Sequence, residues 1–314
     1  MAEGGVDENY RKKGSARRSF LKRIGLGALA VVFSPSLIWG LETLAASEDH
    51  LAKMALLADI KRGEFTPDSI GTITSTPDLK NRIIDKTEDL KGVSSMKLYF
   101  DDGSKSFSVN KKADSSIFLP ASTIKVLICY EAWKMGKKEG QDYLTPELSS
   151  QILEKSYTFM DLLMKLPLAQ NRKPEQLEEI VRDLLTQAGI KPLNQPGNLP
   201  LKVSLDEMHG YLLKMQMPAV MKQAMLQNAG DHNKNYGVST VILQNSHHKL
   251  PAYFKIGLIY DETVSPSQLV NSYYLQMGEK IKVLGYAKGT DLYEVHKQML
   301  YTAAMTANYA VNSS

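Results

Sequence analysis

The most informative stretch of this sequence reads Pro120-Ala121-Ser122-Thr123-Ile124-Lys125 and continues as Val126-Leu127-Ile128-Cys129. Proline fixes a backbone dihedral just before a turn, and Ser122 suits an N-cap or first-turn position. The run from Ile124 to Cys129 is apolar nearly all round, which predicts a helix inside the core. Lys125 interrupts that run three residues after Ser122, on the same helix face.

This serine and lysine have two possible interpretations. An ammonium group inside a core helix is unfavourable unless it is paired or its pKa is lowered, and a desolvated lysine beside a hydroxyl can activate a serine nucleophile. Alternatively, Ser122 caps the helix and Lys125 extends its ammonium group to the surface. Because Ser-x-x-Lys occurs by chance in most chains of this length, the two residues alone favour the second interpretation.

Composition sets the outer limits. The chain has 314 residues, 43% of them hydrophobic, so it can bury a sizeable core. Its formal charge is +4, and residues 1–47 hold seven Lys and Arg against four acidic residues, which leaves the remainder near +1. This balance gives no case for nucleic acid as a partner. A single cysteine excludes an internal disulfide and a cysteine-rich metal site.

The N-terminal segment has the features of an export signal. Ala16-Arg17-Arg18-Ser19-Phe20-Leu21-Lys22 closely matches the twin-arginine motif, and 18 uncharged residues follow from Ile24 to Leu41. Small residues at 45–47 offer a cleavage region. We therefore expect residues 1–47 to be a signal peptide read by the twin-arginine translocase, with a periplasmic or secreted protein and no stable membrane span after cleavage. An uncleaved anchor would leave the protein on the same side of the membrane.

Pro-x-Ser-Thr-x-Lys at the start of an apolar helix resembles the active-site motif of the serine β-lactamase and penicillin-binding DD-peptidase superfamily, class A in particular. The resemblance covers residues 94–314. It implies an α/β fold in which an antiparallel sheet is flanked by helices, with a reduced all-helical subdomain at about 137–215. Residues 48–93 are expected to form a helical lead-in.

The local patterns agree with this order of elements. An Asp-Gly turn predicts a hairpin of residues 96–100 and 105–110, and Gly278-Glu279-Lys280 predicts a second hairpin of 270–277 and 281–286. Residues 252–260 read as a further strand. Between residues 48 and 61, apolar residues recur at helical spacing and predict the buried face of a helix: Leu51, Met54, Ala55 and Ala58, with Leu57 beside them. Helices are expected at 48–61, at 76–90, from 124 to near Gly136, from Thr145, around 175–185, from Ser204 with Glu207 completing a capping box, and from about Asp291.

The resemblance also implies a second serine. Ser156 lies 34 residues after Ser122, where the family carries a serine that relays a proton to the leaving group. Thr158 stands where the family has an asparagine that holds the substrate amide, and it lacks the amide donor. The separation is shorter than is usual in class A, which is why the helical subdomain is expected to be reduced. The alternative for Ser156 is a helix cap.

Class A enzymes carry a Glu-x-x-Leu-Asn loop whose glutamate positions the deacylating water. Ile190-Lys191-Pro192-Leu193-Asn194 keeps the end of this pattern, but Ile190 replaces the glutamate. Isoleucine can neither accept a proton nor orient water, so deacylation is expected to be slow. Glu175, Glu178 and Glu179 fit the solvent face of a helix. The alternative is that this segment is an ordinary proline-rich connector.

Lys255-Ile256-Gly257 stands where the family has Lys-Thr-Gly. The resemblance implies that Lys255 draws the substrate carboxylate and that Gly257 lets the strand approach the substrate closely. Ile256 lacks the threonine hydroxyl that would bind that carboxylate. The backbone N–H groups of Ser122 and Leu258 would form the oxyanion hole. The alternative is a buried strand with a glycine bulge and a surface lysine.

Taken together, the resemblance implies a serine hydrolase that forms an acyl-enzyme on Ser122 with β-lactams or D-alanyl peptides. Lys125 would be the base, and the activity would be of the β-lactamase or D-alanyl-D-alanine carboxypeptidase type. The alternative is a catalytically degenerate envelope protein that uses the fold as a binding scaffold, favoured by the departures at Thr158, Ile190 and Ile256. No cofactor is implied, and His232, His247 and His248 lack the spacing of a zinc site.

Overall fold

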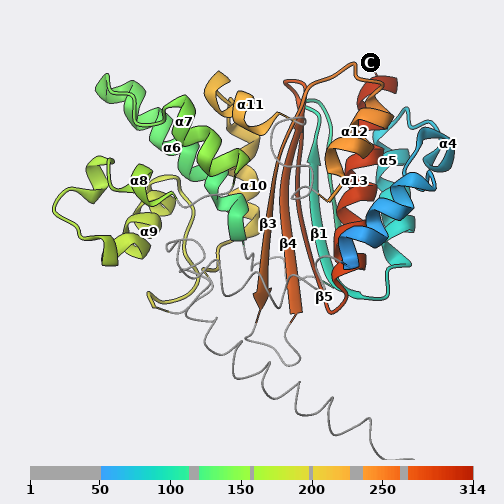
Figure 1. The fold of residues 1–314 in the computed structure, drawn as a ribbon, viewed down its shortest axis with the longest axis horizontal. Coiled ribbons are helices and arrows are strands. Elements are labelled where there is room, and N and C mark those ends of the chain that lie inside the picture. The colour runs from blue at the N-terminus through green and yellow to red at the C-terminus, as the bar shows by residue number, and fades with distance from the viewer. Residues whose placement is uncertain are drawn as a thin grey trace, which may run out of the picture.

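A five-stranded antiparallel sheet forms the centre of the molecule (Figure 1). The computed structural model describes residues 51–112, 120–155, 159–197, 201–226, 236–261 and 268–313. The sheet order is β2-β1-β5-β4-β3. Its strands are β1 (Val93–Asp101), β2 (Ser106–Lys111), β3 (Ala252–Asp261), β4 (Gln268–Met277) and β5 (Ile281–Gly289). The expected signal peptide at 1–47, Ser156 and Thr158 lie outside the described residues.

Both predicted hairpins are present. Asp102 closes the first by accepting hydrogen bonds from the backbone N–H groups of Ser104 (2.9 Å) and Lys105 (2.7 Å). The second turns at Gly278, whose φ of +56° favours glycine. The hairpins meet along β1 and β5, so sequence segments far apart in the chain share the sheet.

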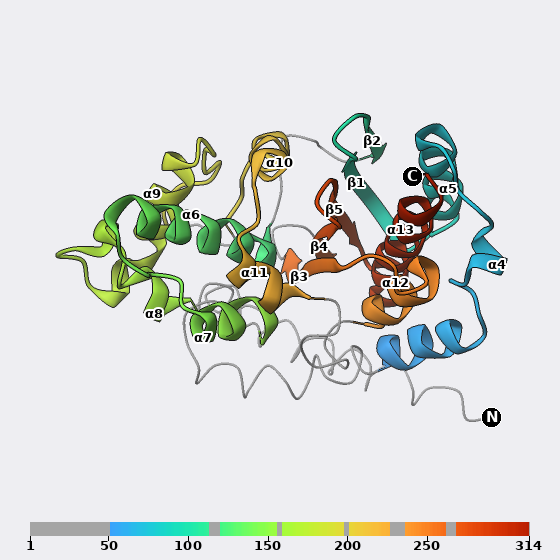
Figure 2. The same cartoon turned by 90° about the horizontal axis from the view of Figure 1, so that it is seen from above.

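One face of the sheet is covered by helices from the two ends of the described chain (Figures 1 and 2). Asp291 begins the longest of them, because its carboxylate accepts the N–H of Tyr293 at 2.9 Å. Strand β4 is buried along nearly its whole length, as expected for a strand covered on both faces. The helices on this side are residues 51–61, α4 (Pro67–Ile70), α5 (Thr76–Glu88), α12 (Val238–Ser246) and α13 (Leu292–Asn312).

The other face carries an all-helical region. Its elements are α6 (Ile124–Glu139), α7 (Pro146–Ser149), a π-helical turn (Ser150–Glu154), α8 (Met160–Leu163), α9 (Leu177–Gln187), α10 (Leu205–Lys214) and α11 (Ala219–Met225). The predicted α/β fold with an antiparallel sheet flanked by helices is therefore confirmed. Within the described ranges, no helix is both long enough and apolar enough to cross a membrane.

Three local expectations need correction. The first helix buries Ala52, Leu56 and Ile60 and leaves Leu51 68% exposed, so the apolar stripe that contains Leu51 faces outward. Helix α6 passes Gly136 and ends at Gly140, whose left-handed φ of +69° caps it.

The third correction concerns the start of α10. Ser204 is its N-cap and accepts the N–H of Glu207 at 3.2 Å, as predicted. The carboxylate of Glu207, however, binds the N–H of Lys191 at 2.7 Å rather than completing a capping box. The Glu207 side chain therefore binds the backbone of the loop that follows α9 and not the N-cap of its own helix.

Candidate active site

Ser122 lies on a tight turn at the beginning of α6. A 3₁₀ turn, Ala121–Thr123, leads directly into the helix, and the N–H of Thr123 donates to the carbonyl of Pro120 at 2.8 Å. Ala121 has a φ of +44°, which is unfavourable for a residue with a side chain. Such backbone persists only where the surroundings hold it, and it concentrates at functional sites. Ser122 itself is partly exposed.

Strand β4 holds this turn in place through Ser272. The hydroxyl of Ser272 donates to the carbonyl of Pro120 at 2.7 Å and lies 2.6 Å from the hydroxyl of Thr123. Both Ser272 and Thr123 are fully buried, so each bond satisfies a group that water cannot reach. Sequence reasoning missed Ser272, because nothing near it in the chain marks it.

Gly257 brings β3 against the same turn. A β-carbon at this position would lie 2.7 Å from the backbone nitrogen of Ser122 and 2.8 Å from that of Thr123. Only a residue without a side chain fits such an approach. Among the described residues, strand β3 is at the edge of the sheet, and it has an isolated bridge from Tyr253 to Leu226 rather than a second neighbouring strand. The Ser-x-x-Lys and Lys-x-Gly segments are therefore neighbours in space.

Lys125 lies in the core, one turn after Ser122. Its side chain is 2% exposed, so the interpretation in which it extends to the surface is wrong. Burial lowers the pKa of its ammonium group from 10.5 to about 8, while nearby Cys129 has a smaller opposite effect. A substantial fraction of Lys125 is therefore neutral near pH 8, as a general base requires.

Lys255 approaches the same region from β3. It is 3% exposed, and its ammonium group donates to the carbonyl of Leu153 at 3.0 Å, so it is not a surface lysine. Burial raises the pKa of the Cys129 thiol to about 12, and both Lys125 and Lys255 oppose that rise. The two lysines of the two motifs therefore lie near one buried thiol, a convergence that the sequence did not predict.

Ile256 and Leu258 turn their side chains to the opposite face of β3. Side chains alternate along a strand, and both residues pack against the core under α12 and α13. The Ile256 side chain therefore packs in the core on the far side of the sheet from the Ser122 turn, where the resemblance had implied a threonine hydroxyl at the site. Leu258 can therefore contribute only its backbone N–H, and not its side chain, to the site.

Ile190 has a structural explanation in the loop after α9. Gly189, with a φ of +76°, donates to the carbonyl of Thr186 at 3.0 Å, and the N–H of Ile190 donates to that of Leu185 at 2.8 Å. This is a Schellman motif, in which an apolar residue packs back on the helix. Ile190 is 1% exposed and belongs to the helical core.

The remaining predicted residues have the following positions. Ser156 and Thr158 are outside the described residues, but Leu153, which binds Lys255, lies in the π-helical turn just before them. His247 and His248 are exposed after α12, whereas His232 is outside the described residues. Over the parts of the chain that the structure describes, no group of three His, Cys, Asp or Glu side chains could hold a metal ion.

No protein-family model matches the sequence, and no curated protein matches it either. Among solved structures, the chain is similar to a class A β-lactamase from Mycobacterium abscessus at 12% identity and a TM-score of 0.47, over 71% of this chain and 97% of that one. It is also similar to a class D β-lactamase from Fusobacterium nucleatum subsp. polymorphum at 13% identity and a TM-score of 0.48, over 74% and 99%.

A third similar structure is a mutant of PBP-A in an acyl-enzyme complex with penicillin G. It is 13% identical, with a TM-score of 0.47, over 75% of this chain and 96% of that one.

Proposed function

We propose that this chain is a serine hydrolase of the β-lactamase and penicillin-binding type that forms an acyl-enzyme on Ser122. The observation that carries the proposal is the contact of Gly257 with the backbone of Ser122 and Thr123. It brings together two motifs that lie far apart in the sequence. The buried Lys125 with its lowered pKa supports the proposal independently.

The chemistry follows from these positions. Neutral Lys125 takes the proton of the Ser122 hydroxyl, whose oxygen attacks the carbonyl carbon of an amide or β-lactam. The backbone N–H groups of Ser122 and Leu258 stabilise the resulting oxyanion. When the intermediate collapses, the C–N bond breaks, and Ser156 relays the proton held by Lys125 to the leaving nitrogen, which returns Lys125 to its neutral form. An ester on Ser122 remains.

Lys255 and Thr158 are the proposed substrate-binding side chains. The ammonium group of Lys255 donates to the carbonyl of Leu153, and its positive charge would attract a substrate carboxylate. Thr158 can offer its hydroxyl to the substrate amide. Gly257 leaves the edge of β3 open to the substrate backbone.

We further propose that the acyl-enzyme is long-lived. Deacylation needs a base that positions water, and Ile190 at the expected position of that base is buried and apolar. Slow turnover suits a penicillin-binding or D-alanyl-peptidase activity better than that of a β-lactamase. The substrates would be β-lactams or peptidoglycan peptides. The twin-arginine segment would deliver the folded enzyme to the periplasm or beyond.

Labelling with a fluorescent penicillin tests this proposal. The full chain should acquire covalent fluorescence that survives denaturation, and Ser122→Ala should abolish it. Ser104→Ala, an exposed serine in the first hairpin, is the matched control and should label normally. Excess D-alanyl-D-alanine peptide should slow the labelling. If neither the fluorescent penicillin nor the D-alanyl-D-alanine peptide became covalently bound, the result would instead favour the non-catalytic binding scaffold.

A further inference from the structure

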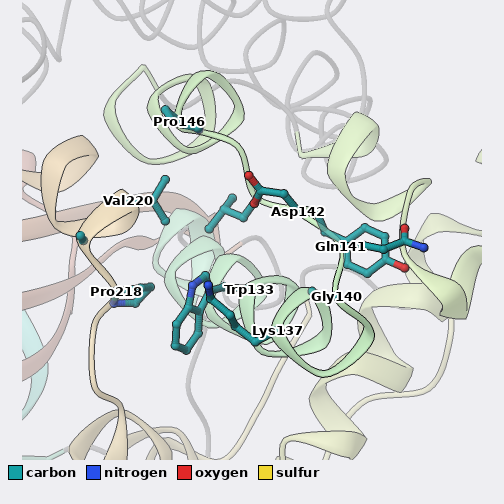
Figure 3. A pocket seen from close by; sticks show the side chains of 12 residues that line it. Trp133, Lys137, Gly140, Gln141, Asp142, Pro146, Pro218 and Val220 are labelled. Carbon is teal, nitrogen blue, oxygen red and sulfur yellow. The ribbon is translucent and has the colours of Figure 1, made fainter.

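A cavity lies beside the later turns of α6, away from Ser122. It has a volume of about 710 Å³, opens to the solvent, and is lined by the end of α6, the residues that lead into α7 and the start of α11 (Figure 3). Trp133 on its wall follows Lys125 by eight residues along α6, a separation of about 12 Å. The size lies in the range of pockets that bind small organic ligands.

The walls of this cavity are held in place. Pro146 is at the first position of α7 and Pro218 is the N-cap of α11, so both have a fixed φ. The hydroxyl of Ser149 donates to the carbonyl of Val220 at 3.0 Å and ties α7 to α11. Gly136 packs so closely under Gln141 that a β-carbon would lie 2.4 Å from its carbonyl oxygen. The cavity is therefore preformed, which lowers the entropic cost of binding.

The lining combines apolar walls with two opposite charges. Trp133, Pro218 and Val220 supply apolar surface, and the indole adds an N–H donor. In Figure 3, Trp133 and Lys137 rise from α6 on one side, and Asp142 directs its carboxylate into the space from the other. Within the described part of the chain, neither Lys137 nor Asp142 has an oppositely charged partner.

We propose that this cavity binds a short peptide with free, charged ends and an apolar side chain. Lys137 would bind the peptide carboxylate, Asp142 its ammonium group, and Trp133 its side chain. A purely anionic ligand would meet Asp142, and a purely cationic one would meet Lys137. A ligand that carries both charges at opposite ends matches both walls. This site goes beyond the proposed serine chemistry and does not depend on it.

Fluorescence of Trp133 can report the binding directly. The chain has two tryptophans, Trp39 and Trp133, so Trp39→Phe leaves a single reporter. Titration with alanyl-leucine should change its emission saturably. Acetylating the amino end or amidating the carboxyl end of the probe should each weaken binding about tenfold, since each removes a charge-assisted hydrogen bond.

Two variants test which wall binds which end. In Lys137→Gln, amidating the carboxyl end of the probe should no longer weaken binding, whereas acetylating its amino end still should. In Asp142→Asn, acetylation should no longer weaken binding, whereas amidation still should. Lys138→Gln and Asp161→Asn, exposed residues outside the lining, are the matched controls and should behave as the parent. All four positions are exposed, so folding should be unaffected.

Ser122→Ala separates this site from the proposed active site, because it should leave the titration unchanged. The proposal is overturned if emission does not change saturably. It is also overturned if the modified probes bind as tightly as alanyl-leucine, or if Ser122→Ala removes the signal.

Discussion

Gly257→Ala should impair acylation far more than it impairs folding. The added β-carbon would lie 2.6 Å from the Ser272 hydroxyl, 2.7 Å from the backbone nitrogen of Ser122 and 2.8 Å from that of Thr123. Carbon contacts in proteins settle near 3.5 Å, so β3 and the nucleophile turn must separate by roughly 0.7–1 Å. Two of these three atoms are the backbone nitrogens of the nucleophile turn, and the third, the Ser272 hydroxyl, is hydrogen-bonded to the same turn. The separation therefore displaces Ser122 itself.

The expected magnitudes differ for the two readouts. Overpacking of this kind costs about 1–3 kcal/mol of unfolding free energy, and each kcal/mol lowers the Tm of a large domain by about 2–4 °C. A displacement of about 1 Å at a reacting atom can cost on the order of 100-fold in rate. The acylation rate with a chromogenic β-lactam and the Tm should be measured on the same preparation.

Gly210→Ala is the matched control for this experiment. Gly210 is inside α10, and a β-carbon there would meet nothing within 4 Å. Replacing a helix-interior glycine should raise the unfolding free energy by about 0.5–1 kcal/mol and leave acylation unchanged. If Gly257→Ala acylated at the parent rate with an unchanged Tm, β3 would not lie against Ser122, and the site described above would be wrong.

Other substitutions probe the same region. Lys125→Met should abolish acylation and yet raise the Tm at pH 7 by an amount equivalent to roughly 1–3 kcal/mol, because the native state disfavours the charged form of a lysine whose pKa is about 8 rather than 10.5. The unfolding free energy of the parent should rise between pH 8 and 10.5 and that of Lys125→Met should not; a parallel pH dependence would contradict the burial. The acylation rate of the parent should rise with pH and level off above about 8, and a flat profile from pH 6 to 10 would exclude Lys125 as the base. Ser272→Ala should lower the unfolding free energy by about 1–3 kcal/mol and slow acylation, because the Pro120 carbonyl and the Thr123 hydroxyl lose the Ser272 hydroxyl as a partner. Ser108→Ala, on the exposed side of β2, should change neither the unfolding free energy nor the acylation rate. Ile190→Glu should destabilise the protein by several kcal/mol, as judged by urea unfolding, without shortening the life of the acyl-enzyme; a stable variant that deacylates quickly would place this residue at the site instead of in the core.

Much of the sheet could be predicted because its signals are local. The Asp-Gly turn after β1 and the glycine turn before β5 each specify a hairpin between neighbouring segments. The helix that follows Ser122 was likewise marked by its proline and its apolar run. In these places the residues that decide the structure are adjacent in the sequence.

The first helix shows where periodicity fails. Ala52, Leu56 and Ile60 recur at helical spacing, as do the exposed residues that begin with Leu51. Since both faces are apolar, the pattern cannot say which one is buried; only the packing of α12 and α13 decides. Helices α11 and α12 were missed because they are short and begin at Pro218 and Gly237, without a capping side chain.

Some residues of the candidate site could be predicted from the sequence, and others are brought to the site only by the fold. Ser122 and Lys125 share one turn of helix and could be paired from their spacing. Ser272 could not be found, because it reaches the nucleophile turn only through its register opposite Gly257 in the β3–β4 ladder. Cys129 was expected to be a core residue, and only the fold shows that lysines from two motifs lie beside it.

Acylation of Ser122 is tested most directly by the intact mass of the protein over time after addition of penicillin G, with Ser122→Ala in parallel. The mass should increase by that of one penicillin, the increase should persist for hours, and it should be absent from Ser122→Ala. An adduct that appears and clears within seconds would contradict slow deacylation and would require a water-positioning base elsewhere in the chain. An adduct that also forms on Ser122→Ala, or no adduct at any time with penicillin or D-alanyl peptides, would contradict Ser122 as the nucleophile.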